Sequence, residues 1–235
     1  MTKRVEQNGK LATSGIVLHR AACYDLLIWL ATRGKEREFR DRCVHLARLA
    51  PGEGVLDVGC GTGTLAIAAK QRVGVAGTVC RVDASPEMIA RAKGKAAQVG
   101  VEVHFQESIA ESLPFPDGSF DAVVTTLMLH HLGPKARRQS ASKVLRVLRP
   151  YGRWLLVDFE GPAQQHGGLL KRIHRHGHIK PGALGELVSE TGLSVVESGP
   201  LGIRNLHFIL AGAPHREDDP STQSAEITIA AQQSR

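Results

Sequence analysis

The feature that most constrains the fold is a glycine-rich turn that directly follows an apolar run. Residues 55–63 read Val-Leu-Asp-Val-Gly-Cys-Gly-Thr-Gly, and an apolar-periodic segment follows from Leu65 to about Val73. The apolar run predicts a buried strand, and the periodic segment predicts a helix. Glycine adopts backbone conformations that other residues avoid, so a ligand can lie close to bare backbone here. The start of the helix presents free N–H groups to a polar or negative group of that ligand.

A second acidic residue follows the turn at a distance that suits nucleoside binding. A further apolar run, from Thr78 to Val82, ends at Asp83, twenty residues after Gly63. An acid at about this offset is placed to accept hydrogen bonds from ribose hydroxyls. The chain is therefore predicted to bind a nucleoside-containing cofactor.

A dinucleotide is one interpretation of this ligand, because Gly61, Gly63 and Ala66 satisfy a relaxed G-x-G-x-x-A pattern. Two features argue against it. Counted from Gly59, the last glycine of the usual G-x-G-x-x-G pattern would fall at position 64, which is threonine. Asp57 at the strand end would repel a pyrophosphate and attract a cationic ammonium or sulfonium group. A nicotinamide-dependent oxidoreductase stays an alternative, and a non-catalytic cofactor-binding protein is another.

Strand and helix patterns alternate along the chain, which predicts an α/β fold with a doubly wound parallel sheet. Ligands of such sheets bind at the carboxyl ends of the strands, where the strand order switches. The expected strands lie near 54–58, 78–83, 101–105, 120–126, 153–159, 193–198 and 204–211, and the expected helices near 19–33, 36–49, 64–73, 86–98, 135–148 and 181–191.

Four units are expected along the chain. Residues 1–18 form a flexible arm, and residues 19–50 form a helical cap at the carboxyl end of the sheet. Residues 51–212 form the cofactor-binding domain. Residues 213–235 are polar and aperiodic, which predicts a disordered tail.

The composition allows one packed domain with a basic surface. The chain has 235 residues, 42% of them hydrophobic, and a net charge of +7. A positive excess favours anionic substrates, membrane surfaces or nucleic acid, but the charges are scattered, so a merely basic enzyme is the preferred interpretation. The cysteines form no C-x-x-C pair and predict neither a zinc site nor disulfides. With no signal peptide evident, a cytoplasmic protein with reduced thiols is expected.

Five segments, in the right order and at the right intervals, resemble the class I S-adenosylmethionine-dependent methyltransferases, and within them the ubiquinone/menaquinone-methyltransferase-like group (methyltransferase type 11). These segments are residues 55–63, 82–89, 111–124, 129–132 and 144–159. The resemblance covers roughly residues 20–160. It implies a Rossmann-like methyltransferase fold, with a mostly parallel seven-stranded sheet whose last two strands form an antiparallel edge.

The resemblance also implies the reaction and its partners. The enzyme would transfer a methyl group from S-adenosylmethionine to an oxygen, carbon or nitrogen atom of an aromatic, quinone-like or lipid-like small molecule. RNA methylation is not favoured, because Thr125-Thr126-Leu127-Met128 stands where an Asn-Pro-Pro-Tyr-like motif would be needed. Contact with a membrane surface and the choice between monomer and homodimer stay open.

The resemblance implies a cofactor site around the glycine turn. Asp57 lies toward the methionyl ammonium, and Asp83 accepts from the ribose hydroxyls. The residues implied are Asp57, Gly59, Cys60, Gly61, Thr62, Gly63, Asp83, Ala84, Met88, Ile109, Ala110, Thr126 and Leu127.

One position departs from the family pattern. Relatives commonly carry an aspartate where this chain has Ile109, and that aspartate accepts from the adenine amino group. Glu107 and Glu111 are the neighbouring candidates to replace it. Loss of this contact is expected to weaken cofactor binding by about 1–2 kcal/mol.

Histidines are the candidates on the acceptor side. His131 is a candidate base and His130 a candidate substrate contact, since histidine titrates near neutrality. The alternative is that the pair only caps the next helix and packs.

A second group of candidates lies outside the five segments. His174 and His176 are candidate catalytic groups and His178 a substrate contact, in a basic stretch from 166 to 180. Anion binding, a base and a mobile basic loop are all compatible with this stretch, whereas no metal is predicted because no carboxylate or cysteine accompanies the histidines. Tyr24 and Trp29 are candidate walls of an apolar substrate pocket, or ordinary helix-core residues.

Overall fold

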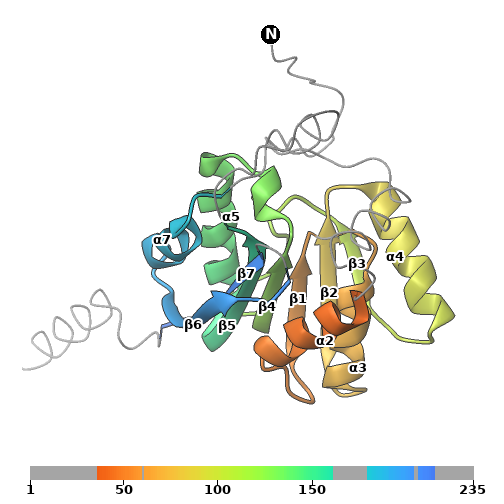
Figure 1. Ribbon diagram of the computed structural model, residues 1–235. Helices are drawn as coiled ribbons and strands as arrows, with labels where there is room; N and C mark the ends of the chain where they lie inside the picture. Colours follow the sequence, from red (N-terminus) through yellow and green to blue (C-terminus); the bar gives the residue numbers. More distant parts are fainter. Residues whose placement is uncertain (1–35, 60, 161–178, 204–205, 215–235) are drawn as a thin grey trace, which may run out of the picture.

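Seven strands form one sheet in the computed structural model, which describes residues 36–59, 61–160, 179–203 and 206–214 (Figure 1). The strands are β1 (Gly54–Val58), β2 (Thr78–Asp83), β3 (His104–Glu107), β4 (Phe120–Thr126), β5 (Leu148–Phe159), β6 (Ser194–Pro200) and β7 (Leu206–Gly212). Their order is β3-β2-β1-β4-β5-β7-β6, with β1 to β5 parallel and β7 and β6 antiparallel at one edge. This confirms the predicted doubly wound, mostly parallel sheet.

The helices begin and end where local sequence signals place them. They are α2 (Glu36–Leu46), α3 (Thr64–Val73), α4 (Pro86–Gln98), α5 (Pro134–Val147) and α7 (Ala183–Glu190), with a single 3-10 turn η1 (Leu129–His131). At the start of α4, the Ser85 hydroxyl accepts from the Met88 N–H at 3.3 Å, and Pro86 occupies the first helical position. Within the described ranges, no helix is long and apolar enough to cross a membrane.

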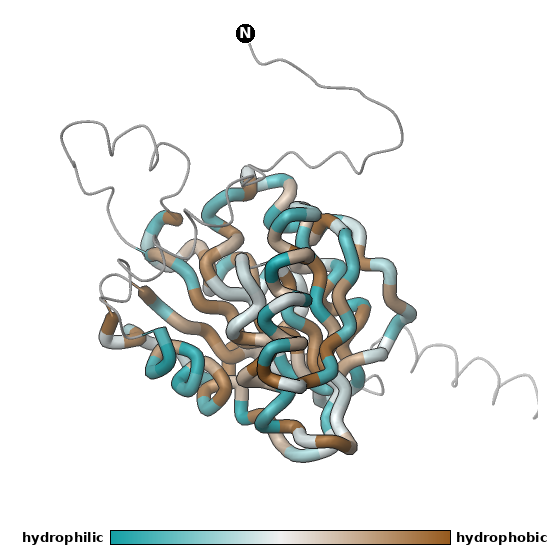
Figure 2. The backbone as a smooth tube through the Cα atoms, turned by 90° about the vertical axis from the view of Figure 1, so that its right-hand side faces the viewer, coloured by the Kyte–Doolittle hydropathy of each residue, from teal (hydrophilic) through white to brown (hydrophobic). Residues whose placement is uncertain are grey.

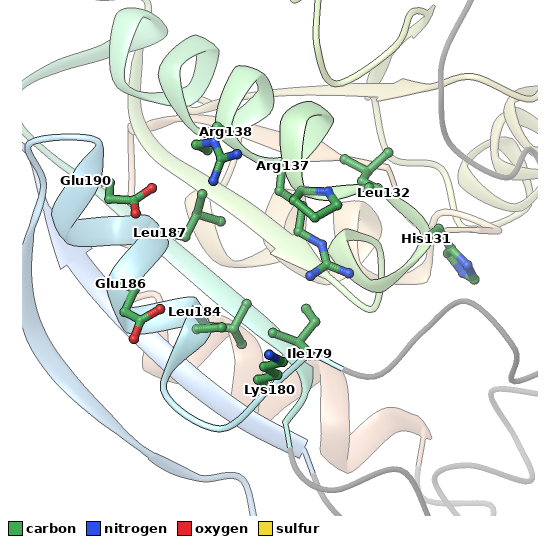
Figure 3. Close-up of a pocket in the computed structure, with 13 residues that line it drawn as sticks. His131, Leu132, Arg137, Arg138, Ile179, Lys180, Leu184, Glu186, Leu187 and Glu190 are labelled. Atoms are coloured by element: carbon green, nitrogen blue, oxygen red, sulfur yellow. The ribbon is translucent and has the colours of Figure 1, made fainter.

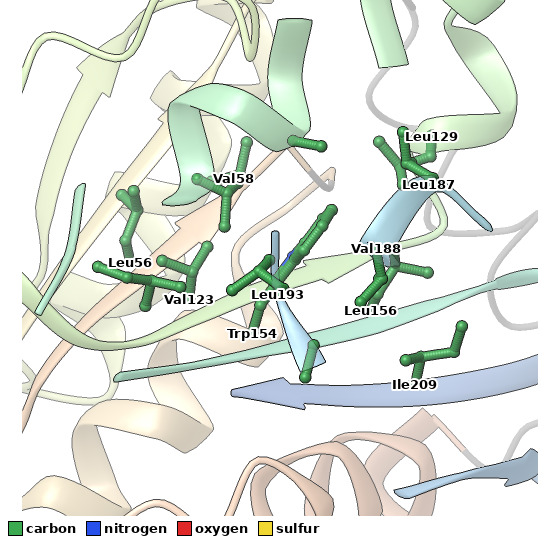
Figure 4. Close-up of a cluster of buried hydrophobic side chains, with 14 of the residues drawn as sticks. Leu56, Val58, Val123, Leu129, Trp154, Leu156, Leu187, Val188, Leu193 and Ile209 are labelled. Atoms are coloured by element: carbon green, nitrogen blue, oxygen red, sulfur yellow. The ribbon is translucent and has the colours of Figure 1, made fainter. Parts of the chain in front are cut away.

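The core has two layers because strand side chains alternate between the faces of the sheet. Hydrophobic residues are concentrated on the central strands (Figure 2). On one face, Val55 and Leu155 pack with residues of α2 and α3 such as Phe39. On the other, Leu56 and Trp154 pack with residues of α5 and α7 (Figure 4).

Two strands differ from their expected bounds. The third begins at His104 rather than near 101, because the Val101 N–H bonds the Ala96 carbonyl and so belongs to the turn that ends α4. The fifth begins at Leu148 rather than near 153, with an irregular register between Phe120 and Ala122 of its neighbour β4. The residues from Leu148 to Gly152 therefore belong to the strand and not to a loop.

Helix α2 is the described part of the expected helical cap. Helix α2 packs beside α3 on one face of the sheet, because its buried residues Phe39 and Cys43 belong to the core of that face. Arg153 of β5 anchors the chain just after α2 by donating to the carbonyl oxygens of Ala47 at 2.6 Å and Arg48 at 2.8 Å. Near the start of α2, Arg40 Nε donates to the hydroxyl of Thr64, directly after the glycine turn, at 2.8 Å. The cap role of residues 19–50 stays a prediction, since residues 19–35 lie outside the described residues.

Candidate active site

The carboxyl ends of β1, β2, β4 and β5 bring the predicted site together. Strands β2 and β3 lie on one side of β1 and β4 on the other, so the strand order switches between β1 and β4. In open α/β sheets this switch point is where ligands bind. Asp57, Asp83, Thr126 and Asp158 each lie at or next to the last residue of one of these strands.

The glycine turn is pressed against its surroundings so closely that side chains do not fit. Gly63 has φ 84°, and a Cβ atom built on it would lie 2.6 Å from the Cβ of Ala92 on α4. Gly59 has φ 55°, and a Cβ there would lie 2.8 Å from Cγ of Met128. The turn therefore presents backbone to any ligand above it, as the sequence predicted.

Asp83 is the acid of the site that solvent reaches. Its side chain is 13% exposed at the end of β2. Oδ1 accepts the Ser85 N–H at 2.9 Å, which fixes the carboxylate at the start of α4. Burial raises the pKa of Asp83, and the nearby Arg81 guanidinium opposes that rise. The placement suits the ribose contact predicted for Asp83.

Asp57 lies deeper. It is 1% exposed, and neither carboxylate oxygen has a hydrogen-bond partner among the described residues. Burial raises its pKa, opposed first by Arg81 and then by Arg40. Contact between Asp57 and a cofactor ammonium stays a prediction, since its oxygens are buried beneath the turn.

Arg81 and Asp158 are site residues that sequence reasoning missed. Arg81 lies under the glycine turn. Its side chain is fully buried, with Nε 3.9 Å from Oδ2 of Asp57 and Nη2 3.5 Å from Oδ2 of Asp83. Nη2 also donates to the carbonyl of Gly61 in the glycine turn. A signal was available, because Arg81 is a charged residue inside an apolar strand, on the same face as Asp83 two residues later.

The adenine-side residues are brought close to Asp83. The Ser108 N–H donates to the Asp83 carbonyl at 3.0 Å, which places Ile109 and Ala110 beside the end of β2. Met88 of α4 is buried in the core on one face of the sheet. Ala84 follows Asp83 directly and is half-buried. Their contacts with an adenine stay predictions.

The segment after β4 forms the opposite wall of the site. Thr126 is fully buried and Leu127 nearly so, with Leu127 at φ 53°. Thr62 in the glycine turn is also buried, and its hydroxyl accepts from Lys95 Nζ of α4 at 2.7 Å. Positive φ at a leucine is uncommon and marks a sharp bend at the strand end.

The two adjacent histidines have different surroundings. His130 Nδ1 lies 2.6 Å from Oδ1 of Asp158, and the His130 backbone N–H donates to Oδ2 at 3.1 Å. Burial alone would raise the pKa of Asp158, but His130 and these hydrogen bonds lower it overall. An ionised Asp158 accepts the Nδ1–H of His130, which leaves Nε2 as the free nitrogen with a lone pair.

Among the described residues, no carboxylate is hydrogen-bonded to the ring of His131. Burial, together with the charge on His130, lowers its pKa from 6.5 to about 4, so its ring is neutral at physiological pH. The two rings lie 3.9 Å apart. His131 reaches the rim of a pocket of about 590 Å³ between α5 and α7, whose wall includes Arg137 and Lys180 (Figure 3).

Six of the predicted site residues lie outside the described residues. They are Tyr24, Trp29, Cys60, His174, His176 and His178. Their roles stay predictions.

The chain is similar to known methyltransferases in sequence. Residues 55–152 match the family described as Methyltransferase domain. A demethylmenaquinone methyltransferase of Thermus thermophilus is 37% identical over 151 residues, which cover 64% of this chain and 67% of the relative. A ubiquinone/menaquinone biosynthesis C-methyltransferase of Pseudomonas fluorescens is 34% identical over 163 residues, covering 68% of this chain and 63% of the relative. The similarity thus spans about two thirds of the relatives' length.

Solved structures share the fold. A SAM dependent methyltransferase from Aquifex aeolicus has a TM-score of 0.66 at 20% identity, covering 83% of this chain and 99% of its own. The [4+2]-cyclase SpnF has a TM-score of 0.67 at 17% identity, covering 87% of this chain and 100% of its own. At such low identity these likenesses show the fold alone.

Proposed function

Since the chain belongs to the class I S-adenosylmethionine-dependent methyltransferases, in the ubiquinone/menaquinone-methyltransferase-like group, we propose that it methylates a ring carbon of a small aromatic hydroquinone. The methyl donor of the family is S-adenosylmethionine, which replaces the nicotinamide alternative. The acceptor class is proposed from the relatives, which are named for menaquinone and ubiquinone biosynthesis and for C-methylation. The observation that carries the mechanism is the hydrogen bond between His130 and Asp158.

The described residues fit this cofactor. The close-packed glycines leave backbone open at Gly59 and Gly63, and the partly exposed carboxylate of Asp83 suits the two ribose hydroxyls. Ile109 and Ala110 lie beside the end of β2, where an adenine would follow the ribose. When bound, S-adenosylmethionine supplies a methyl group on a sulfonium, which an electron-rich atom displaces in line.

We assign the base to His130. Its Nε2 would take the proton of an acceptor hydroxyl, so that electron density moves to the neighbouring ring carbon. The bound cofactor would supply its methyl group to that carbon and would leave as S-adenosylhomocysteine. The ring then loses the hydrogen of that carbon as a proton to water and regains its hydroxyl proton from His130. Asp158 holds the imidazole in the tautomer this requires.

This assignment exchanges the roles expected for the two histidines. His131, expected as the base, has no hydrogen-bonded carboxylate among the described residues, and burial disfavours the protonated form that a base must reach. We propose that His131 shapes the acceptor side of the cleft instead. We also propose that the enzyme works in the reducing cytoplasm, which the free thiols of Cys43 and Cys80 support.

The first experiment is calorimetric titration of the purified chain with S-adenosylhomocysteine, with NAD as the control. We expect S-adenosylhomocysteine to bind with a micromolar Kd and NAD not to bind. Asp83→Ala should weaken this binding about tenfold or more, because the ribose loses a charged acceptor. Absence of binding by the wild-type chain would favour the non-catalytic alternative.

The second experiment tests the base. Labelled methyl donor is supplied with 1,4-naphthohydroquinone, and with a phenol, an arylamine and phospholipid vesicles as competing acceptor classes. We expect carbon-methylated naphthohydroquinone as the product, identified by NMR. His130→Gln should lower kcat about 100-fold or more without changing the Kd for S-adenosylhomocysteine. His104→Gln, on the exposed strand β3, is the matched control. An unchanged kcat in His130→Gln would refute the base assignment.

A further inference from the structure

A buried cation lies under the cofactor turn. Arg81 is paired in register with Asp57 of the neighbouring strand, and its side chain is 0% exposed. Arginine is almost never buried to this extent unless it is paired. Its nearest charges are Asp57 at 3.9 Å and Asp83 at 3.5 Å. One guanidinium therefore lies within ion-pair distance of two carboxylates from different strands, while its Nε and Nη1 have no hydrogen-bond partner among the described residues.

The same guanidinium touches the glycine turn. Nη2 donates to the Gly61 carbonyl. Nη1 lies below Gly63, so close that a Cβ atom on that residue would come within 2.8 Å of it. Arg81 thus fills the space between the turn and the ends of β1 and β2. The planar guanidinium has several donors and can contact a carbonyl and a carboxylate at the same time. The compact ammonium of a lysine does this less well.

Other charges around the turn do not replace this cation. Among the described residues, the charged side chains near the turn include Asp57 of β1, Asp83 of β2, Glu107 of β3 in register with Asp83, Glu36 and Arg40 of α2, and Lys95 of α4. Arg40 is engaged with Glu36 at 3.2 Å and with the Thr64 hydroxyl at 2.8 Å. Lys95 donates to Thr62. Burial raises the pKa of both Asp57 and Asp83, and Arg81 is the cation that opposes this rise most strongly for each.

We propose that Arg81 is a positioning residue of the cofactor site, which fixes the glycine turn and pairs with the carboxylates of Asp57 and Asp83 before the cofactor binds. Part of the cost of binding is the ordering of loops and the desolvation of poorly paired polar groups. A turn and a ribose-binding carboxylate that are already held in place reduce this cost. Arg81 is not proposed to touch the cofactor, since its side chain is buried beneath the turn.

The test measures S-adenosylhomocysteine binding by calorimetry from about pH 6 to about pH 8.5, with melting temperatures recorded in parallel. The variants are Arg81→Met, which removes the charge, and Arg81→Lys, which keeps it. Arg146→Met is the matched control, because Arg146 also donates to backbone carbonyls, those of Leu113 and Phe115, but lies away from the turn.

Arg81→Met should raise the Kd about tenfold or more and make binding weaken further toward about pH 6, because the unpaired carboxylates take up protons. Arg81→Lys should keep the pH profile of the wild type with a Kd raised about threefold or more. Arg146→Met should change only the melting temperature. If Arg81→Met does not fold, Arg81→Lys decides alone.

A wild-type Kd and pH profile in the Arg81 variants would overturn the proposal, even with a lowered melting temperature, because Arg81 would then be only structural. The inference rests on the cofactor assignment, and the wild-type titration separates the two. If the wild-type chain does not bind S-adenosylhomocysteine, the cofactor assignment fails. If it binds and the Arg81 variants bind equally well, only this inference fails.

Discussion

The lowered pKa of His131 predicts that the folded protein loses stability in mild acid. Its pKa in the folded protein is about 4, against the usual 6.5. As the pH falls below 6.5, the unfolded chain takes up a proton on this histidine while the folded protein does not, until about pH 4. The stabilisation from the neutral ring is therefore fully present above pH 6.5 and is lost between 6.5 and about 4.

The size of the effect follows from the same two pKa values. At about 1.4 kcal/mol per pKa unit, the interval from 6.5 to about 4 corresponds to at most about 3.5 kcal/mol of unfolding free energy. The ring keeps some contact with solvent, and screening there lowers the expectation to about 2 kcal/mol. Replacing His131 by glutamine removes the titrating group and should remove this part of the pH dependence.

The assay is urea unfolding at a series of pH values, followed by tryptophan fluorescence, for the wild type and His131→Gln. Other titrating groups contribute to both proteins and cancel in the difference. We expect the stability of the wild type relative to the variant to fall by about 2 kcal/mol between about pH 7 and about pH 4. His104→Gln should show no such change. A difference curve flat to within about 0.5 kcal/mol would refute the reasoning.

Two further predictions concern packing. Gly63→Ala should cost about 2–4 kcal/mol in unfolding free energy and abolish S-adenosylhomocysteine binding, because the new methyl group would meet Ala92 at positive φ. Gly94→Ala on the same neighbouring helix has open space and should be neutral or stabilising, so equal losses in both variants would contradict the argument. Trp154→Phe should cost about 1–3 kcal/mol in urea unfolding, because Nε1 loses its 2.9 Å bond to the Thr125 hydroxyl and a void remains; wild-type stability would contradict this.

Much of the fold could be predicted because its signals are local. The strand, turn and helix around Gly59 and Gly63 follow from neighbouring residues, as does the start of α4 at Ser85. Sequence reasoning falls short where a local pattern competes with tertiary contacts. The start of β5 depends on its pairing with β4, and the position of α2 depends on its packing beside α3. The periodicity of the sequence carries no information about either contact.

The sequence by itself predicted a nucleoside-containing cofactor and placed Asp83 at a strand end, because both depend on spacing along one strand–turn–helix unit, and the resemblance of five segments to a known family implied S-adenosylmethionine. Only the tertiary structure decided which histidine has a carboxylate, since Asp158 is 28 residues from His130 in the chain and reaches it through the pairing of β4 with β5. The role of Arg81 was likewise decided by the register that sets it opposite Asp57. Charges interact through space, so their partners depend on strand order and register rather than on local sequence.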